Sequence, residues 1–187
     1  MVLDITDFIR NYISSFEWTG KEGYSAGYYY PYKDSAGIDT IGIGHKVTDY
    51  SSSPLTSEQV YKLFETDLQS RLVVIRKLIS PEIYAELSEK QVAAVLSWYF
   101  NTGRASSFFW NYINEKNYKA LSTFWTENYI SSNGLQLAGL LSRRQSERDL
   151  FFFEENKKKT VSTVLILGAL ITLVVLSYFL TRNLKNA

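Results

Sequence analysis

Apolar residues recur at intervals of three and four along several stretches of this chain, which is the spacing of one face of an α-helix. The first stretch runs from Asp4 to Phe16, with Asp4 or Thr6 able to cap its start. A second begins at a capping box, Thr56 to Gln59, and ends before Pro81. The pattern therefore predicts one helix near the N-terminus and a long amphipathic helix in the middle of the chain.

Another capping box, Ser88 to Gln91, begins the most apolar of these stretches, which ends at Gly103. Because this stretch is apolar on most faces, we expect it to be the buried core helix. Further helices, separated by a loop at Ser131 to Gly134, are predicted over residues 107–115, 118–129 and 135–153. The region after residue 88 is therefore expected to be all helical.

Between the first two helices the pattern changes to that of a hairpin. A turn at Ser35 to Gly37 joins an aromatic strand, residues 28–32, to a short apolar one, residues 38–43. Such a turn brings Asp34 and Thr40 close together. Glycines at positions 42 and 44 interrupt the second strand, which weakens it unless a close backbone approach or a ligand needs the missing side chains. A substrate groove would be one such need.

Charge and composition exclude several classes of protein. Residues 1–156 carry 15 basic and 19 acidic residues, a net charge of −4, which disfavours nucleic acid binding. The chain has no cysteine, so a disulfide framework and a zinc-thiolate site are excluded. No metal or other cofactor is expected. Acidic residues stand near the N-terminus where a secretory signal would be apolar, so no signal peptide is predicted.

Residues 160–180 form a run of 21 residues without a charge, which as a helix spans ~30 Å, the hydrocarbon thickness of a bilayer. Lys157 to Lys159 and Arg182 bracket this run as interfacial anchors. We therefore predict one folded domain over 1–156 and, over 157–187, a basic stop segment, a single transmembrane helix and a short tail. The excess of Lys before the span would place the domain in the cytoplasm.

Three motifs carry a resemblance to a known family. The stretch from Tyr32 to His45 resembles the active-site hairpin of phage-type lysozymes, glycoside hydrolase family 24, whose pattern is Tyr-x-Asp-x-x-Gly-x-x-Thr-Ile-Gly-x-Gly-His. Phe100 to Gly103 resembles the family's Phe-Asn-x-Gly element. Residues 139–151 resemble its closing Gly-Leu-x-x-Arg-Arg-x-x-Glu-x-x-Leu-Phe helix. The resemblance extends from about Asp4 to Phe153.

The resemblance implies a mostly helical α+β fold with two lobes, a small β-hairpin lobe and a helical lobe, joined by the long helix. It also implies a muramidase that cuts the β-1,4 bond between N-acetylmuramic acid and N-acetylglucosamine. Such hydrolysis uses one carboxylic acid and one carboxylate. Asp34 would be the base and Thr40 would hold the attacking water, an arrangement that predicts inversion at the sugar.

Two glutamates compete for the role of the acid. Glu22, followed by Gly23, reproduces the family's Glu-Gly pair and is slightly favoured. Glu17 is the alternative acid, because Gly20 would end a helix before it reached Glu22, whereas Glu17 falls on the last regular turn. The sequence leaves both open.

The resemblance also suggests residues around the acid pair. Tyr32, Tyr30 and Asn101 are candidate substrate-binding residues, and His45 is expected to be a hydrogen-bonded packing residue. The family places an arginine of the last helix near the acid, a role open to Arg143, Arg144 and Arg148. No single arginine is selected.

The expected protein is a membrane-anchored peptidoglycan hydrolase that acts in phage wall penetration or host lysis. Its partners would be peptidoglycan glycan strands, a lipid bilayer of the host inner membrane or a virion, and other virion membrane or capsid proteins. One alternative is an inactive lysozyme-fold structural protein of a membrane-containing virion. A membrane pore ranks last, because one span with few polar residues offers little to line a channel.

Overall fold

The computed structural model describes residues 4–17, 22–34, 37–51, 53–103, 106–132 and 135–153. The chain divides into two compact units, Met1–Phe151 and Phe152–Ala187, and all the elements named below belong to the first. The predicted span at residues 160–180 lies outside the described residues. Within the described ranges, no helix has both the length and the apolar character needed to cross a bilayer.

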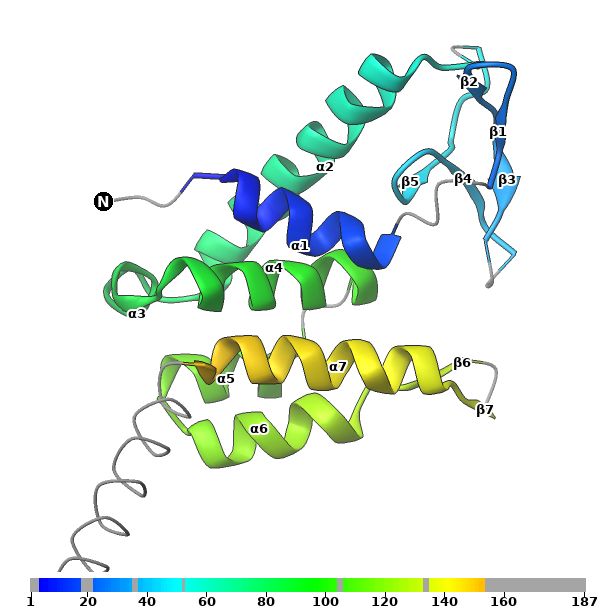
Figure 1. Ribbon diagram of the computed structural model, residues 1–187. Helices are drawn as coiled ribbons and strands as arrows, with labels where there is room; N and C mark the ends of the chain where they lie inside the picture. Colours follow the sequence, from blue (N-terminus) through cyan, green and yellow to red (C-terminus); the bar gives the residue numbers. More distant parts are fainter. Residues whose placement is uncertain are drawn as a thin grey trace, which may run out of the picture. The chain divides into compact units, whose positions relative to one another are not determined.

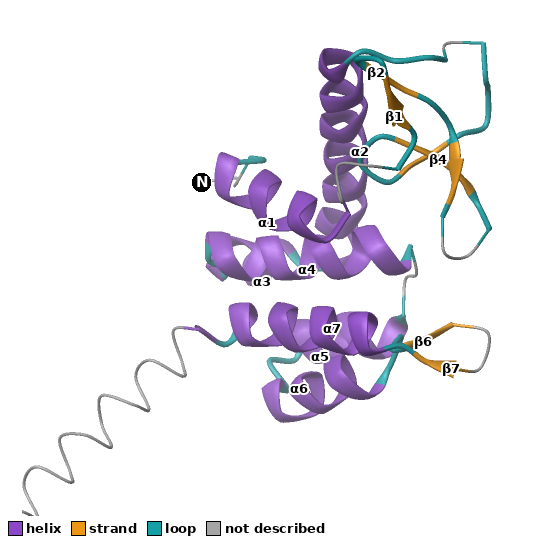
Figure 2. Cartoon of the chain, turned by 45° about the vertical axis from the view of Figure 1, so that its right-hand side comes forward, coloured by secondary structure: helices purple, strands orange, loops and turns teal. Residues whose placement is uncertain are grey.

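The first unit is mostly helical, with short antiparallel strands (Figures 1 and 2). Its helices are α1 (Asp7–Glu17), α2 (Ser57–Leu78), α3 (Pro81–Glu86), α4 (Glu89–Thr102), α5 (Ser107–Asn114), α6 (Tyr118–Glu127) and α7 (Ala138–Phe151). Its strands are β1 (Tyr24–Ser25), β2 (Tyr28–Tyr29), β3 (Tyr32–Lys33), β4 (Asp39–Ile41), β5 (His45–Lys46), β6 (Ser131–Ser132) and β7 (Leu135–Gln136). The predicted α+β class is confirmed.

Helix α4 is the core of the helical part, as the sequence predicts. It packs against α1, α2 and α7 (Figure 1), and its residues from Val92 to Trp98 are all buried. Trp98 is fully buried and stacks on Phe109 of α5 with ring centres 3.9 Å apart. An apolar helix in this position holds its neighbours at fixed angles, because packed interiors leave little free volume.

The helix boundaries follow the capping residues. Thr56 and Ser88 each accept a hydrogen bond from the backbone N–H three residues on, and the side-chain oxygens of Gln59 and Gln91 each accept one from the backbone N–H of the cap residue, so both capping boxes are formed. Helix α4 ends at Gly103, which adopts the left-handed conformation with φ of 59°. These caps fix both ends of α4 and the start of α2.

The hairpin that carries the motif differs from the predicted one in two ways. Strands β3, β4 and β5 form one sheet, in which Tyr32 lies opposite Thr40. The aromatic run is not one strand, because Tyr28–Tyr29 pairs with Tyr24–Ser25 in a separate hairpin. The second strand ends at Ile41, and residues 42–44 form a turn into β5. Left-handed φ values of 59° at Gly42 and 71° at Gly44 make that turn possible.

Two further elements depart from the prediction. Helix α3 follows α2 at once, with Ser80 as its N-cap and Pro81 in its first turn, where a missing N–H costs nothing. Strands β6 and β7 form a hairpin with Ser131 opposite Gln136, so β6 falls in the predicted loop and β7 in the first residues of the predicted helix 135–153, which begins only at Ala138. The expectation of an all-helical region after residue 88 was therefore wrong at this point.

Candidate active site

A cavity of about 670 Å³ collects most of the predicted site residues. Its lining comes from the end of α1, the motif hairpin, α2, the end of α4 and the start of α7. The lining residues used below are Glu17, Glu22, Tyr32, Asp34, Thr40, Gly44, Phe100, Asn101 and Arg143. Segments distant in sequence thus meet around one space that is open to solvent.

Glu17 is the last residue of α1, and its side chain is only 15% exposed. The apolar face of α1 places it there, because Ile9 and Ile13 are buried against the core. Thr6 starts the helix by accepting a hydrogen bond from the N–H of Ile9 at 3.3 Å. Glu17 therefore enters the cavity from a rigid helix.

Arg143 of α7 binds this glutamate. Its Nη1 donates to Oε1 of Glu17 at 2.6 Å, and its side chain is only 6% exposed. Arg144 instead donates to Oδ1 of Asn101 at 2.6 Å, while Arg148 pairs with Asp149 at the surface. Of the three arginines that the sequence left open, Arg143 is therefore the one in contact with a candidate acid.

Asp34 and Thr40 lie together on the hairpin, as predicted. Oδ1 of Asp34 accepts a hydrogen bond from the N–H of Ile38 at 2.8 Å, which orients the carboxylate across the turn. Thr40 is 3% exposed, and its hydroxyl donates to the carbonyl oxygen of Ile38 at 3.2 Å. Both side chains line the cavity, so a carboxylate and a hydroxyl face the same space as Glu17.

Glu22 lines the same cavity, but from the exposed segment before β1. The carboxylates converge on Tyr32: burial raises the pKa of the Tyr32 hydroxyl, and the negative charges of Glu22, Glu17 and Asp34 raise it further. The geometry thus keeps both glutamates at the cavity. It gives only Glu17 a helix and a buried cationic partner.

The three predicted substrate-binding residues are placed differently from one another. Tyr32 and Asn101 line the cavity. Tyr30 is 41% exposed, and among the described residues it is not part of the cavity wall. Its backbone N–H donates to the carbonyl of Gly23 at 2.7 Å, which extends the pairing of β1 with β2 by one position.

Gly44 keeps the floor of the cavity open. A β-carbon at this position would lie 3.1 Å from Oε2 of Glu17 and 3.3 Å from the ring of Phe100. A side chain here would therefore press on the glutamate. Gly44, the second glycine of the Gly-x-Gly-His motif, therefore lets the backbone approach Glu17 closely. A close backbone approach was one of the two predicted reasons for a glycine here.

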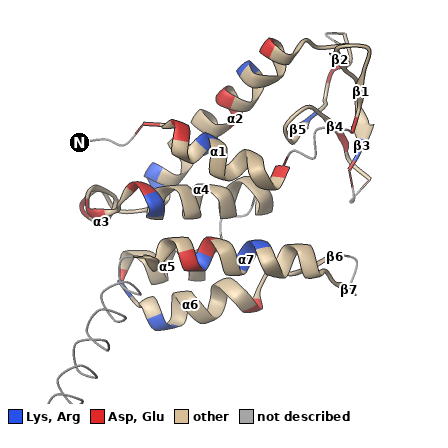
Figure 3. Cartoon of the chain, in the orientation of Figure 1, with Lys and Arg blue, Asp and Glu red and all other residues tan. Residues whose placement is uncertain are grey.

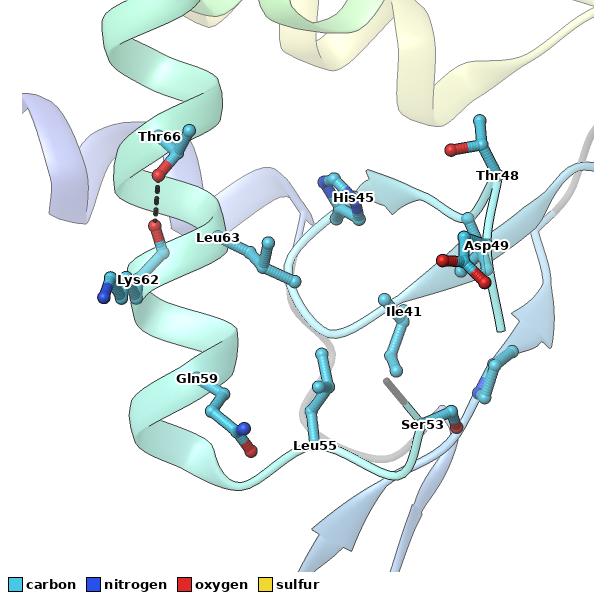
Figure 4. A pocket seen from close by; sticks show the side chains of 12 residues that line it. Ile41, His45, Thr48, Asp49, Ser53, Leu55, Gln59, Lys62, Leu63 and Thr66 are labelled. Atoms are coloured by element: carbon cyan, nitrogen blue, oxygen red, sulfur yellow. Dashed lines mark hydrogen bonds between the residues drawn. The ribbon is translucent and has the colours of Figure 1, made fainter. Parts of the chain in front are cut away.

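His45 faces away from this cavity. Because side chains alternate along a strand, Thr40 and its partner Lys46 line the candidate active site, whereas Ile41 and its partner His45 line a second cavity of about 490 Å³. Figure 4 shows the second cavity between the hairpin and residues of α2. Nδ1 of His45 lies 2.9 Å from Oδ2 of Asp67, so His45 is a hydrogen-bonded packing residue, as predicted.

The arrangement provides groups suited to acid–base chemistry. The described residues contain no cluster of three or more histidine, cysteine or acidic side chains able to hold a metal ion. What the cavity offers is carboxyl groups from α1 and from the motif hairpin, with the hydroxyl of Thr40 on the same hairpin as Asp34. Two carboxyl groups flanking a bond are the requirement for glycoside hydrolysis.

Comparison with known proteins gives a consistent picture. Residues 21–147 match the family model described as phage lysozyme. The chain is 30% identical over 162 residues to an endolysin of Bacillus phage B103, covering 82% of this chain but only 56% of that protein. It is 34% identical over 128 residues to the endolysin of Salmonella phage P22, covering 64% of this chain and 84% of that one.

Solved structures agree on the fold. The active form of the P1 phage endolysin Lyz superposes with a TM-score of 0.62 at 19% identity, covering 80% of this chain and 85% of that one. The muramidase domain of SpmX from Asticaccaulis excentricus superposes with the same TM-score at 24% identity, covering 79% of this chain and 97% of that one. The fold is therefore lysozyme-like, as the sequence predicts.

The family match spans more than half of the chain and includes the motif hairpin, α4 and most of α7. The predicted enzyme class, lysozyme, is thereby confirmed at the level of the family. From its sequence and its fold, this chain belongs to the phage lysozyme family.

Proposed function

We propose that this chain is a peptidoglycan hydrolase that cleaves the β-1,4 bond between N-acetylmuramic acid and N-acetylglucosamine. One observation carries the proposal: Glu17, Asp34 and Thr40 line a single open cavity, with Glu17 held by Arg143. The endolysins and the muramidase domain similar to this chain support the choice of substrate.

In this mechanism Glu17 protonates the oxygen of the leaving sugar while Asp34 accepts a proton from the attacking water. Thr40 holds that water through its hydroxyl oxygen. The hydroxyl donates its proton to the carbonyl oxygen of Ile38, so the lone pairs of the hydroxyl oxygen can accept a hydrogen bond from the water. The positive charge that develops on the sugar ring in the oxocarbenium-like transition state lies between the two carboxyl groups that flank the bond. A carboxyl separation of ~6.5–9.5 Å would leave room for the water and give inversion.

Glu17 is preferred over Glu22 as the acid for a physical reason. A general acid must be positioned within hydrogen-bond reach of the leaving oxygen throughout the reaction. Glu17 is fixed by a helix and by Arg143, while Glu22 is exposed on the segment before β1. The sequence motif slightly favours Glu22 as the acid. We instead assign Glu22 to the lining of the glycan cleft, near Tyr32.

The test of the function is product analysis. The full-length chain, incubated with purified peptidoglycan, is expected to release new reducing ends of N-acetylmuramic acid. Inversion of a β link predicts that proton NMR detects the α-anomer first, before mutarotation mixes the two. A β-anomer as first product would indicate retention and contradict the water-holding role of Thr40. No reducing ends beyond a boiled control would favour the inactive structural protein.

We further propose that residues 160–180 anchor the enzyme to a bilayer, in a virion or at the host inner membrane. The support is the uncharged run itself, with Lys157 to Lys159 before it. The full-length chain is then expected to sediment with membranes and to stay there through alkaline carbonate extraction. Recovery of the chain in the carbonate supernatant would contradict the anchor.

A further inference from the structure

Behind the candidate acid lies a buried carboxylate that the reaction itself does not use. Glu147 of α7 is fully buried. Its Oε1 accepts hydrogen bonds from Ser97 Oγ at 2.7 Å and Arg143 Nε at 3.0 Å. Its Oε2 accepts from Trp125 Nε1 at 3.1 Å and lies 3.1 Å from Nη1 of Arg144. Groups from α4, α6 and α7 thus fix this carboxylate.

Arg143 links this buried carboxylate to the cavity. One edge of its guanidinium binds Glu147, and Nη2 donates to the carbonyl and hydroxyl oxygens of Ser97 at 3.1 and 3.2 Å. The guanidinium carbon lies 4.9 Å from the ring centre of Phe16. Because the guanidinium is planar and rigid, fixing these atoms also fixes the direction of Nη1, which binds Glu17.

We propose that Glu147 is a positioning residue, which through Arg143 fixes the carboxyl group of Glu17 in the cleft and offsets the positive charge acting on it. This proposal rests on the proposed role of Glu17 as the acid. Glu147 is fully buried behind Arg143 and is not among the described residues that line the cavity. It therefore acts on the substrate only through its neighbours.

The charge balance explains why such a residue is needed. A general acid must carry its proton, yet a cation in contact with a carboxyl group favours the ionised form. Arg143 alone would therefore work against Glu17, and the negative charge of Glu147 on the other edge of the guanidinium reduces that effect. Figure 3 shows that α7 carries both basic and acidic residues.

The ionisable groups around Glu147 and Glu17 are known. Glu147 faces Arg143, Arg144 and, at longer range, the hydroxyl of Tyr12 on α1. Burial lowers the pKa of Arg144 to about 10, and the charge of Glu147 counteracts this shift. Besides Arg143, the ionisable groups that share the cavity with Glu17 are Glu22, Tyr32, Lys33, Asp34, Lys46 and Arg71. All six stay unchanged in the variants below.

The test compares Glu147→Gln with Glu147→Asp in the full-length chain, using initial rates on purified peptidoglycan over a range of pH. For Glu147→Gln we expect kcat to fall roughly tenfold with KM unchanged, and the alkaline limb of the pH profile to move down by about one pH unit. Glu147→Asp keeps the charge and is expected to restore the wild-type limb with a smaller loss of kcat. Asp149→Asn, an exposed carboxylate on the same helix, is the matched control and is expected to change neither.

A residue that only stabilised the fold would lower the amount of folded enzyme without moving the pH limb. An unmoved limb in folded Glu147→Gln therefore overturns the proposal. If circular dichroism shows that Glu147→Gln does not fold, Glu147→Asp decides, with its rates expressed per folded molecule: a lower kcat at unchanged KM supports the proposal, and wild-type kinetics overturn it. Activity retained in Glu17→Gln would instead refute the proposed acid, so the two failures are distinguishable.

Discussion

Replacing Glu17 with Gln is expected to lower the rate of peptidoglycan hydrolysis by roughly 10²–10⁴-fold, the range that general acid catalysis contributes. Gln preserves the size of the side chain and an oxygen that accepts from Arg143, but it has no proton to give to the leaving sugar. Glu22→Gln is the matched substitution on the same cavity. It is expected to leave the rate nearly unchanged, since Glu22 is exposed and acts as a wall of the cleft. Release of reducing ends at saturating peptidoglycan measures both.

The reverse order of effects would show that the acid is on the segment before β1 and that Arg143 pairs with Glu17 for structural reasons only. Folding must be checked at the same time, because Glu17→Gln leaves the buried Arg143 with one ionised partner fewer. Removing one member of a buried ion pair destabilises a protein strongly. Glu17 is partly exposed, so we expect a modest fall in unfolding temperature and full structure at the assay temperature.

The parts of the site that the sequence predicts are those built by short-range interactions. Asp34 and Thr40 meet because both hydrogen-bond to Ile38, within one turn of chain. The helix starts at Thr56 and Ser88 were equally predictable, since a capping box is complete within four residues. Where a motif fixes backbone register over a few residues, it also fixes which side chains share a face.

The choice among arginines was not predictable, because it depends on contacts between distant segments. Arg143 and Glu17 are 126 positions apart, and they meet only because α1 and α7 both pack on α4. Arg143 and Arg144 are neighbours in sequence, yet one faces the acid and the other Asn101. Both are buried on the inner side of α7, and tertiary packing alone decides which of them reaches Glu17.

The elements missed by the sequence are too short to carry a period. Strands β1, β6 and β7 have two residues each, so alternation cannot be recognised in them, and they are defined by their pairing alone. Helix α3 has six residues, and its signals, Ser80 and Pro81, also mark the end of α2. The same two residues therefore serve as a stop and as a start.

Gly42→Ala is expected to destabilise the hairpin and its attachment to α2 by roughly 2–4 kcal/mol, combining overpacking with left-handed strain. An added β-carbon would lie 2.4 Å and 2.9 Å from the two methyl groups of Val60, which is 4% exposed. Rotating Val60 does not relieve the clash, because both methyl groups face Gly42 and a β-branched side chain in a helix has one strongly preferred rotamer. Chemical denaturation of the full-length chain measures the effect.

Gly27→Ala separates the two causes, since Gly27 has a φ of 89° but no atom within 4 Å of an added β-carbon. It is expected to cost only the left-handed strain, about 1–2 kcal/mol. Equal losses in the two variants would mean that the hairpin moves away from α2 without cost and that the contact with Val60 is unimportant. A larger loss in Gly42→Ala, together with a lower rate of hydrolysis at full folding, would show that this contact also sets the position of Thr40, two residues earlier on β4. The first glycine of the motif would then be needed for packing and the second, Gly44, for the space beside the acid.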